Sequence, residues 1–299
     1  MRLICSRMRG SMEFIRKKSR SGGLSVEQKG QALYLTFPSF TRTQAVEHLF
    51  STRIGGVSEG IFSTMNLSYT RGDRKEAVDE NYRRIADILG CKPEAFVCSD
   101  QTHTTNIRKV TEADCGKGVL VPKDYRDVDG LVTDREGIVL VTFFADCVPL
   151  YFLDAKRRVI GLAHSGWRGT VGRIGKNMID TMVSDYGCKK EHILAAIGPS
   201  ICADCYEVSE DVAGQFEAEF GSAVLQKGKR PGKYQLDLWK ANEEVLLQAG
   251  LTVEQIEVTD ICTCCNASLL FSHRASEGKR GNLGAFLMLK RENREGNEC

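Results

Sequence analysis

The chain has 299 residues, of which 42% are hydrophobic and 27% are charged, which is the composition of an ordinary globular protein. This apolar fraction excludes intrinsic disorder, 29 glycines are too few for a collagen, and the length excludes a small disulfide-stapled scaffold. The formal net charge is +2, but seven Lys or Arg residues and only one acid lie in the first 20 residues, so the rest of the chain lacks the basic excess of a nucleic-acid-binding surface.

The first part of the chain, residues 1–30, is a basic segment rich in Ser, Gly and Arg. We expect it to be disordered or derived from cloning, and we expect a single catalytic domain over residues 31–299, where no repeat or low-complexity linker occurs. No apolar segment follows the basic residues, so a cytoplasmic location with reduced cysteines is expected. The longest apolar stretch, 138–145, is far shorter than the ~20 residues that cross a bilayer, so we expect no membrane partner.

Hydrophobic periodicity predicts the elements of this domain in chain order. Apolar residues on one helix face predict a helix over 76–89, and a β-branched and aromatic run predicts a buried strand at 137–144. Segments 151–153 and 159–163 flank a polar turn and predict a hairpin. Later elements are helices at 171–183, 209–220 and 238–249, and strands at 193–197, 256–261 and 285–289. We therefore expect an α+β fold with α/β/α layers, in which helices cover a mixed β-sheet.

Three residues that can bind a metal lie where predicted strands meet turns, namely His103, Cys147 and His164. If the hairpin is paired, Cys147 and His164 lie on neighbouring strands at the same end of the sheet, where such proteins gather their site residues. Each residue alone is better explained as a hydrogen-bonded core histidine or an inert buried cysteine. Together they indicate a metal site, because two imidazoles and a thiolate suit zinc and leave one tetrahedral position free.

Seven short segments of the chain combine turn glycines with polar residues. They are Ser51-Thr52-Arg53-Ile54-Gly55-Gly56-Val57-Ser58, Met65-Asn66-Leu67, Gln101-Thr102-His103, Asp127-Val128-Asp129-Gly130, Ala145-Asp146-Cys147-Val148-Pro149, His164-Ser165-Gly166-Trp167-Arg168-Gly169 and Ile197-Gly198-Pro199-Ser200-Ile201. Taken together and in this order, they resemble the motifs of the YfiH-type family, also called the laccase-domain or multicopper polyphenol oxidase family. The resemblance extends over about residues 46–288.

Members of this family are described as purine nucleoside phosphorylases that also deaminate adenosine and cleave methylthioadenosine, with a zinc ion held by His, Cys and His. The resemblance therefore implies a zinc enzyme that converts adenosine, inosine, guanosine or methylthioadenosine and phosphate to the free base and the sugar 1-phosphate. The metal ligands that it implies are His103, Cys147 and His164, with copper as the alternative ion. The preferred nucleoside and the choice between a monomer and a homodimer stay open.

Four further residues are candidates for substrate binding or catalysis. Arg53 and Arg168 can bind phosphate, because a guanidinium matches phosphate oxygens in bidentate fashion, although a turn-capping or surface role is nearly as well supported for each. Asn66 can bind ribose or base through its amide, or can form a turn. Asp146 can act as a general acid or base, can orient a ligating histidine, or can cap a loop.

Other polar residues are interpreted as structural. Asp127 and Asp129 flank a glycine turn, and we favour a turn over a metal site. The segments Cys202–Cys205 and Cys262–Cys265 can hold a second metal or a disulfide, but 56 residues separate them, far more than the ~15–20 of a zinc ribbon. We therefore expect reduced structural thiols there, including Cys264.

Three other functions stay open. Cys147 can be a nucleophile with His103 or His164 as its base, as in an amide hydrolase acting on cell-wall precursors. The abundant thiols can serve a metal- or redox-buffering protein. A copper-binding oxidoreductase is a further alternative, although five histidines without a His-x-His pair do not supply a laccase copper cluster.

Overall fold

The structure, a computed structural model, describes residues 13–18 and 22–292 of the chain. The α-helices in this part are α1 (Pro38–Thr43), α2 (Lys75–Leu89), α3 (Trp167–Val171), α4 (Ile174–Tyr186), α5 (Glu210–Phe220) and α6 (Leu238–Gln248). The strands are β1 (Ser25–Lys29), β2 (Ala32–Thr36), β3 (Val46–Ser51), β4 (Phe96–Cys98), β5 (Ile107–Lys109), β6 (Gly130–Thr133), β7 (Val139–Phe144), β8 (Val148–Asp154), β9 (Val159–Ser165), β10 (Ile193–Ile197), β11 (Glu207–Ser209), β12 (Leu225–Lys227), β13 (Lys233–Leu236), β14 (Ile256–Val258) and β15 (Leu283–Leu289).

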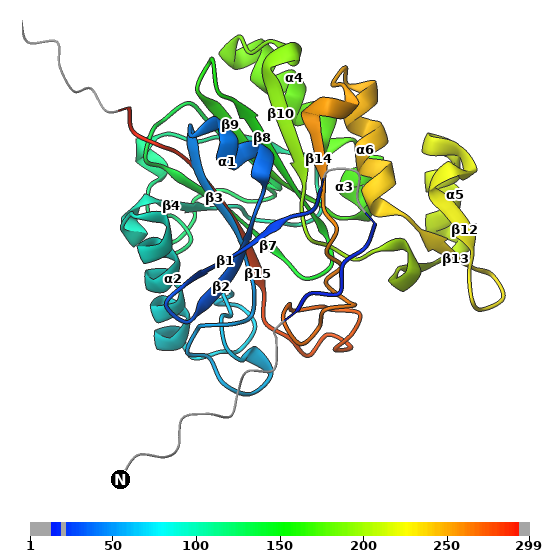
Figure 1. Ribbon diagram of the computed structural model, residues 1–299, viewed down its shortest axis with the longest axis horizontal. Coiled ribbons are helices and arrows are strands. Elements are labelled where there is room, and N and C mark those ends of the chain that lie inside the picture. Colours follow the sequence, from blue (N-terminus) through cyan, green and yellow to red (C-terminus); the bar gives the residue numbers. More distant parts are fainter. Residues whose placement is uncertain (1–12, 19–21, 293–299) are drawn as a thin grey trace, which may run out of the picture.

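Most of the strands form two six-stranded mixed sheets. The first sheet has the order β1-β2-β3-β15-β7-β4, and the second has the order β14-β10-β8-β9-β6-β5. Most neighbours are antiparallel, but β4 runs parallel to β7, β5 to β6, and β14 to β10. The predicted hairpin is formed by β8 and β9. A small third sheet, β11-β13-β12, lies beside α5 at the edge of the molecule (Figure 1).

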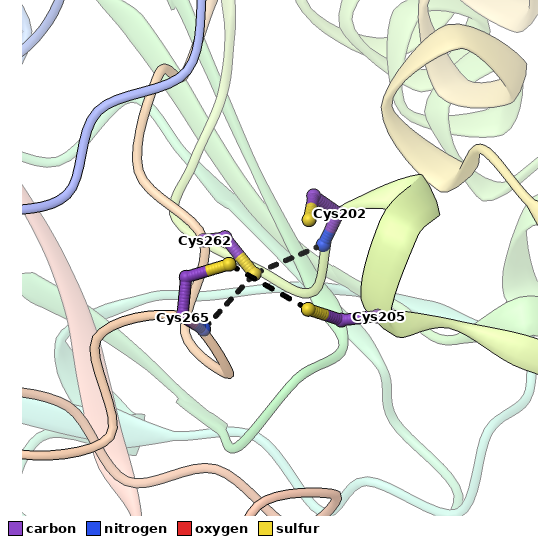
Figure 2. Close-up of side chains that lie close together, drawn as sticks. All are labelled: Cys202, Cys205, Cys262 and Cys265. Atoms are coloured by element: carbon purple, nitrogen blue, oxygen red, sulfur yellow. Dashed lines mark hydrogen bonds between the residues drawn. The ribbon is translucent and has the colours of Figure 1, made fainter.

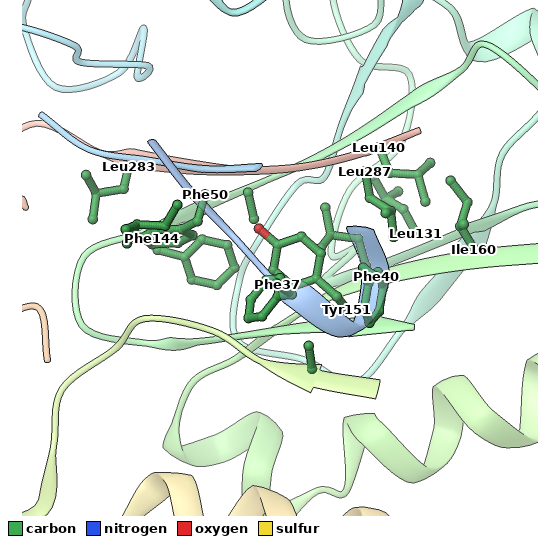
Figure 3. Packing of buried hydrophobic residues seen from close by; sticks show 14 of the residues in the cluster. Phe37, Phe40, Phe50, Leu131, Leu140, Phe144, Tyr151, Ile160, Leu283 and Leu287 are labelled. Atoms are coloured by element: carbon green, nitrogen blue, oxygen red, sulfur yellow. The ribbon is translucent and has the colours of Figure 1, made fainter. Parts of the chain in front are cut away.

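The two large sheets pack face to face through an apolar core rich in aromatic side chains (Figure 3). Successive side chains of a strand point to opposite faces. On β8, Tyr151 and Leu153 belong to this central core, whereas Leu150 and Phe152 belong to the core on the other face of the second sheet. Because both faces are covered, the strands are continuous apolar runs, and this is the pattern that made them recognisable in the sequence.

Helices cover the outer face of each large sheet. Val78, Tyr82 and Ile85 of α2 pack against the first sheet, while α4 and α6 cover the second sheet on the other side of the molecule (Figure 1). Each helix buries one apolar stripe and leaves the opposite stripe in water. Within residues 13–18 and 22–292, no helix is both long and apolar enough to span a membrane.

The predicted α+β class, with mixed β-structure covered by helices in one domain, is confirmed. The strands expected in a single sheet are divided between two sheets, because periodicity shows that a strand is buried without showing which strands are its neighbours. The predicted helices correspond to α2, α4, α5 and α6. The strand predicted at 256–261 is shorter than expected and ends at Val258.

The folded part of the chain begins before the predicted boundary at residue 30. β1 pairs antiparallel with β2, and Arg16 forms a 2.5 Å ion pair with Asp260. β1 is an edge strand whose side chains are mostly polar and exposed, which protects an edge from pairing with other chains but leaves no hydrophobic pattern to recognise. Residues 1–12 and 19–21 of the predicted leader lie outside the described residues.

His48 of β3 is buried, and its Nε2 accepts a 2.8 Å hydrogen bond from the backbone N–H of Phe37. Burial lowers the pKa of His48 to about 4, below the ordinary value of 6.5. The unfolded chain therefore binds this proton at a higher pH than the folded chain does. The resulting stabilisation is complete above the unfolded pKa and is lost as the pH falls from about 6.5 toward 4.

We expect His48→Gln to flatten the acid side of the stability profile. The decrease in unfolding free energy between about pH 7 and pH 4, measured by urea denaturation, should be smaller than in the wild type by up to about 3 kcal/mol. His192→Gln, which alters a more exposed histidine, should leave the wild-type profile in place. An unchanged slope in His48→Gln would contradict the neutral buried state of this ring.

Candidate functional site

Cys147 lies in the loop where the chain passes from β7 in the first sheet to β8 in the second. His164 lies near the end of β9, and the hairpin register places it opposite Pro149, close to Cys147 in the sequence. The hairpin therefore brings the thiol and the imidazole to the same end of the second sheet. Asp146 has a φ of 90°, a left-handed conformation that Asp adopts more readily than most residues.

His103 belongs to the loop that passes from β4 in the first sheet to β5 in the second. Asp129, a buried residue directly before β6, holds this loop in place. Its carboxylate accepts hydrogen bonds of 2.9 to 3.2 Å from the backbone N–H groups of Thr102, His103 and Thr104. The same carboxylate lies 2.7 Å from Nδ1 of His164. One buried anion therefore fixes the positions of both histidines.

The ligand atoms of His103, Cys147 and His164 all lie within 4.8 Å of one another, so these residues can hold a metal ion. Nδ1 of His164 is hydrogen-bonded to Asp129, so Nε2 is left to bind a metal. This arrangement is usual for metal-ligating histidines. Gly166 permits the close approach, since a Cβ there would lie 2.8 Å from Cδ2 of His103 and 3.3 Å from Sγ of Cys147. His103 is exposed, so the group opens toward solvent on one side.

The charges of Cys147, His164 and Asp129 support one another. Burial raises the pKa of the Cys147 thiol, but the charge of His164 and hydrogen bonds with both histidines outweigh it, so the net shift of this pKa is downward. Burial lowers the pKa of His164, but the Cys147 thiolate and Asp129 outweigh it, so the net shift is upward. Burial raises the pKa of Asp129, but its hydrogen bond to His164 and the charge of that ring outweigh this effect, so the net shift is downward. The site therefore favours the thiolate, the form of Cys147 that binds a metal.

A cavity of about 450 Å³ adjoins the three side chains. Part of its wall is apolar, with Tyr69 and Phe143 among the lining residues, and two arginines from distant loops, Arg71 and Arg280, also line it. Nε of Arg280 is buried without a hydrogen-bond partner. Burial and the charge of Arg71 lower the pKa of Arg280 to about 10. The cavity therefore offers an apolar surface beside two mutually repelling cations, which suits a ligand that is part apolar and part anionic.

Arg53 and Asn66, which were predicted to bind substrate, are not among the residues that line this cavity. Nε and Nη1 of Arg53 donate to the backbone carbonyls of Ser63 and Ala267 at 2.7 and 3.0 Å. Asn66 is buried. Its Nδ2 donates hydrogen bonds to the backbone carbonyl of Ser68 and to the carboxylate of Asp73, and its Oδ1 accepts hydrogen bonds from two backbone N–H groups. Both side chains hold loops together in this structure.

Arg168 and Asp146 also have contacts other than those expected. Arg168 is exposed, and its guanidinium lies 4.2 Å from the ring of Trp167, outside the cavity lining. Asp146 accepts 2.7 Å hydrogen bonds from Oγ1 of Thr263 and from the backbone N–H of Arg274. Of the roles considered for Asp146, the contacts fit loop capping.

Three residues of the site escaped the sequence analysis. The sequence favours a turn role for Asp129. In the structure, its carboxylate is hydrogen-bonded to the ring of His164. Its only local signal is an acid directly before a strand, while its partner lies 35 positions away on β9. Arg71 and Arg280 occur in Gly-containing loops that resemble many surface loops, and only the fold brings them to one cavity.

Asp129→Asn is expected to weaken metal binding by about 10- to 100-fold, because a neutral amide no longer fixes the ring and tautomer of His164 or raises the basicity of its Nε2. The measurement is competition for the bound metal with a chromogenic chelator, on protein shown by circular dichroism to be folded. Asp127→Asn is the matched control, since it alters an exposed carboxylate that accepts a hydrogen bond from Oγ1 of Thr102. Equal metal affinity in the two variants would show that Asp129 has no role in ligand orientation.

Comparisons with known proteins place the chain in a family. The family model described as "Multi-copper polyphenol oxidoreductase laccase" matches residues 47–290. "Purine nucleoside phosphorylase YlmD" of Bacillus subtilis is 37% identical over 246 residues, which cover 81% of this chain and 87% of that protein. The protein of the same name from Geobacillus stearothermophilus is 38% identical over 248 residues, which cover 81% of this chain and 89% of that protein.

A solved structure supports the same assignment. The crystal structure of Bacillus licheniformis hypothetical protein YfiH, 34% identical, matches with a TM-score of 0.83 over 89% of this chain and 99% of that one. The sequence matches and the structural match thus cover the same large part of the chain. The chain therefore belongs to the multi-copper polyphenol oxidoreductase laccase family, the YfiH-type family.

Proposed function

We propose that the chain is a zinc-dependent purine nucleoside phosphorylase that converts adenosine, inosine, guanosine or methylthioadenosine and phosphate to the free purine and the sugar 1-phosphate. The observation that carries this proposal is the His103–Cys147–His164 group at the edge of a cavity that also contains two arginines. The names of the relatives from Bacillus subtilis and Geobacillus stearothermophilus support the same reaction.

Phosphorolysis needs a phosphate ion oriented toward C1′ of the nucleoside while the purine leaves. Arg71 and Arg280 are the cations best placed to bind it, because both line the cavity, whereas Lys123, which also lines it, is ion-paired with Asp100. A phosphate between them would offset the repulsion of the two guanidinium groups and would give Nε of Arg280 an acceptor. This choice replaces Arg53 and Arg168 as the proposed phosphate ligands.

The rest of the cavity suits a nucleoside. Tyr69 and Phe143 provide aromatic surface against which a purine can pack. A zinc ion held by His103, Cys147 and His164 would supply Lewis acidity and would lower the pKa of a bound water toward ~7. The second property is what deamination of adenosine requires, so we include that reaction as a side activity.

The proposal predicts that the purified protein releases hypoxanthine and ribose 1-phosphate from inosine only when phosphate is present. Cys147→Ala and His164→Ala each remove a metal ligand and should lower kcat/KM at least about 100-fold, together with the zinc content. The measurement is chromatography of the products and metal analysis of the protein. Cys91→Ala, which removes a thiol outside the site, should retain activity. Full turnover in either ligand variant, or base release without phosphate, would contradict the proposal.

Arg71→Gln and Arg280→Gln are expected to raise KM for phosphate by about 10- to 100-fold, since each loses a charge-assisted hydrogen bond worth about 1.5–3 kcal/mol. Zinc content should stay at the wild-type level in both variants. Arg74→Gln, an exposed change close to Arg71, is the control. If Arg168→Gln alone raised KM for phosphate, Arg71 and Arg280 would not be the phosphate ligands.

One observation favours a second function, that of a cysteine-dependent amide hydrolase. The pKa of the Cys147 thiol is lowered beside His164, as in an activated nucleophile. The two proposals differ in what metal removal does. A hydrolase would act without metal and would be inactivated by thiol alkylation, whereas a zinc phosphorylase would lose activity when the metal is removed.

The histidines of the chain bear on the copper oxidoreductase alternative. Nε2 of His48 accepts a hydrogen bond from the backbone N–H of Phe37, and Nε2 of His192 lies 3.0 Å from Nζ of Lys156. Neither of these histidines, nor His273, belongs to the metal-binding group of Cys147. A copper ion can occupy the same His–Cys–His group as zinc. Multicopper chemistry needs additional imidazoles that the described residues do not gather there.

A further inference from the structure

A second group of potential metal ligands lies away from the cavity. It consists of Cys202 and Cys205, in the loop after β10, and Cys262 and Cys265, in the loop after β14. Figure 2 shows the four side chains turned toward one another from these two segments. None of the four lines the cavity of about 450 Å³ described above.

The pairing of the strands explains why residues so far apart in sequence meet. β10 and β14 are parallel neighbours, so the loops that follow them both start at the same end of these strands. Beyond the strands, Ser200 and Cys262 form a parallel bridge, and the N–H of Thr263 donates to the carbonyl of Ser200 at 3.1 Å. Sequence separation, the argument against a shared site, is therefore irrelevant here, because the sheet brings the two C-x-x-C pairs together.

The positions of the sulfur atoms suit a tetrahedral ion. All four Sγ atoms lie within 4.8 Å of one another, and those of Cys205 and Cys265 are 3.5 Å apart. Zn–S bonds of ~2.3 Å place the sulfurs of a tetrahedral site about 3.8 Å from one another. The observed separations, 3.5 Å for this pair and at most 4.8 Å for the others, differ from the tetrahedral value by about 1 Å or less. They exceed the ~2.05 Å of a disulfide bond, and all four cysteines are free thiols.

Burial raises the pKa of the Cys205 and Cys265 thiols to about 11, so it is the contacts of Cys262 that suit sulfur in its anionic form. The Sγ of Cys262 accepts hydrogen bonds from the backbone N–H groups of Cys202 at 3.2 Å and Cys265 at 3.4 Å (Figure 2). A thiolate is a much better acceptor than a neutral thiol, and N–H bonds to the sulfur are common around metal-bound cysteines. The ammonium of Lys17, ion-paired with Asp204 at 2.8 Å, adds a positive charge close to the group.

We propose that Cys202, Cys205, Cys262 and Cys265 bind a structural Zn²⁺, separate from the ion at His103, Cys147 and His164. Four thiolates occupy every position of a tetrahedral ion, so this site has no place for substrate. Soft thiolate ligands in tetrahedral arrangement select zinc among the common divalent ions. The proposal does not depend on the activity of the other site.

The ion would brace the loop that carries Cys147. Asp146, its neighbour, accepts from Oγ1 of Thr263 at 2.7 Å, and its backbone carbonyl accepts from the N–H of Ile201 at 3.0 Å. Thr263 and Ile201 belong to the two loops that the four cysteines would join. Loss of the ion is therefore expected to loosen the loop of Cys147 as well as to lower the stability of the fold.

The test is zinc content per chain, measured by inductively coupled plasma mass spectrometry on full-length protein purified under reducing conditions. The background is Cys147→Ala/His164→Ala, which disables the first site, so failure of the phosphorylase proposal does not affect the result. This protein should retain about one zinc ion per chain. Adding Cys262→Ser should remove that zinc and lower Tm by more than about 5 °C. Adding Cys264→Ser, the matched control in the same loop, should leave zinc and Tm as in the background.

A second measurement covers the case in which Cys262→Ser does not fold. The otherwise unaltered background protein is loaded with Co²⁺ in place of zinc, and its spectrum should show the thiolate-to-cobalt charge-transfer band and the visible bands of a tetrahedral four-sulfur site. Zinc-free background protein without these bands, iron in place of zinc, or a Cys205–Cys265 disulfide found by mass spectrometry would each overturn the proposal. Zinc retained in a folded Cys262→Ser variant would also overturn it.

Discussion

The geometry of the site depends on the hydrogen bonds made by the carboxylate of Asp129. A fully buried anion is strongly destabilising unless its oxygens are bonded, and those of Asp129 accept from three consecutive backbone N–H groups of the His103 loop and bond the ring of His164. The requirement to satisfy this charge leaves the His103 loop and the His164 ring little freedom. Because the thiolate of Cys147 in turn stabilises the charge of His164, Asp129, His164 and Cys147 behave as one electrostatic unit.

The two-sheet architecture explains where this unit is found. The loop of Cys147 joins β7 to β8 and the loop of His103 joins β4 to β5, so each carries the chain from the first sheet to the second. Arg280 lies on the segment that returns from β14 to β15, again between the sheets. These crossing segments lie between the strands, and His103, Cys147 and Arg280 on them line a shared cavity. The strands supply a rigid frame, and one of them, β9, contributes His164 to the same cavity.

The same frame accounts for the second cluster of ligands. Parallel pairing of β10 and β14 sets two C-x-x-C segments side by side, and their loops contact Asp146 beside Cys147. The proposed structural site is thus linked through Asp146 to the proposed catalytic site. Through Asp146, the packing of the two cysteine loops supports the position of Cys147 although none of the four cysteines lines the cavity.

The amino-acid sequence by itself determined the elements and their class, since burial on both faces of strands such as β7 and amphipathic spacing in helices such as α2 are local patterns that survive in one dimension. It also indicated His103, Cys147 and His164 as partners, because a hairpin has a predictable register and the motifs are distinctive. Only the tertiary structure decided that Asp129 bonds His164, that Arg71 and Arg280 rather than Arg53 face the cavity, and that Cys202 and Cys262 are neighbours. These contacts join residues tens to hundreds of positions apart. They are fixed by the pairing of strands that are distant in the sequence, which is a property of the assembled sheets and leaves no local trace in the chain.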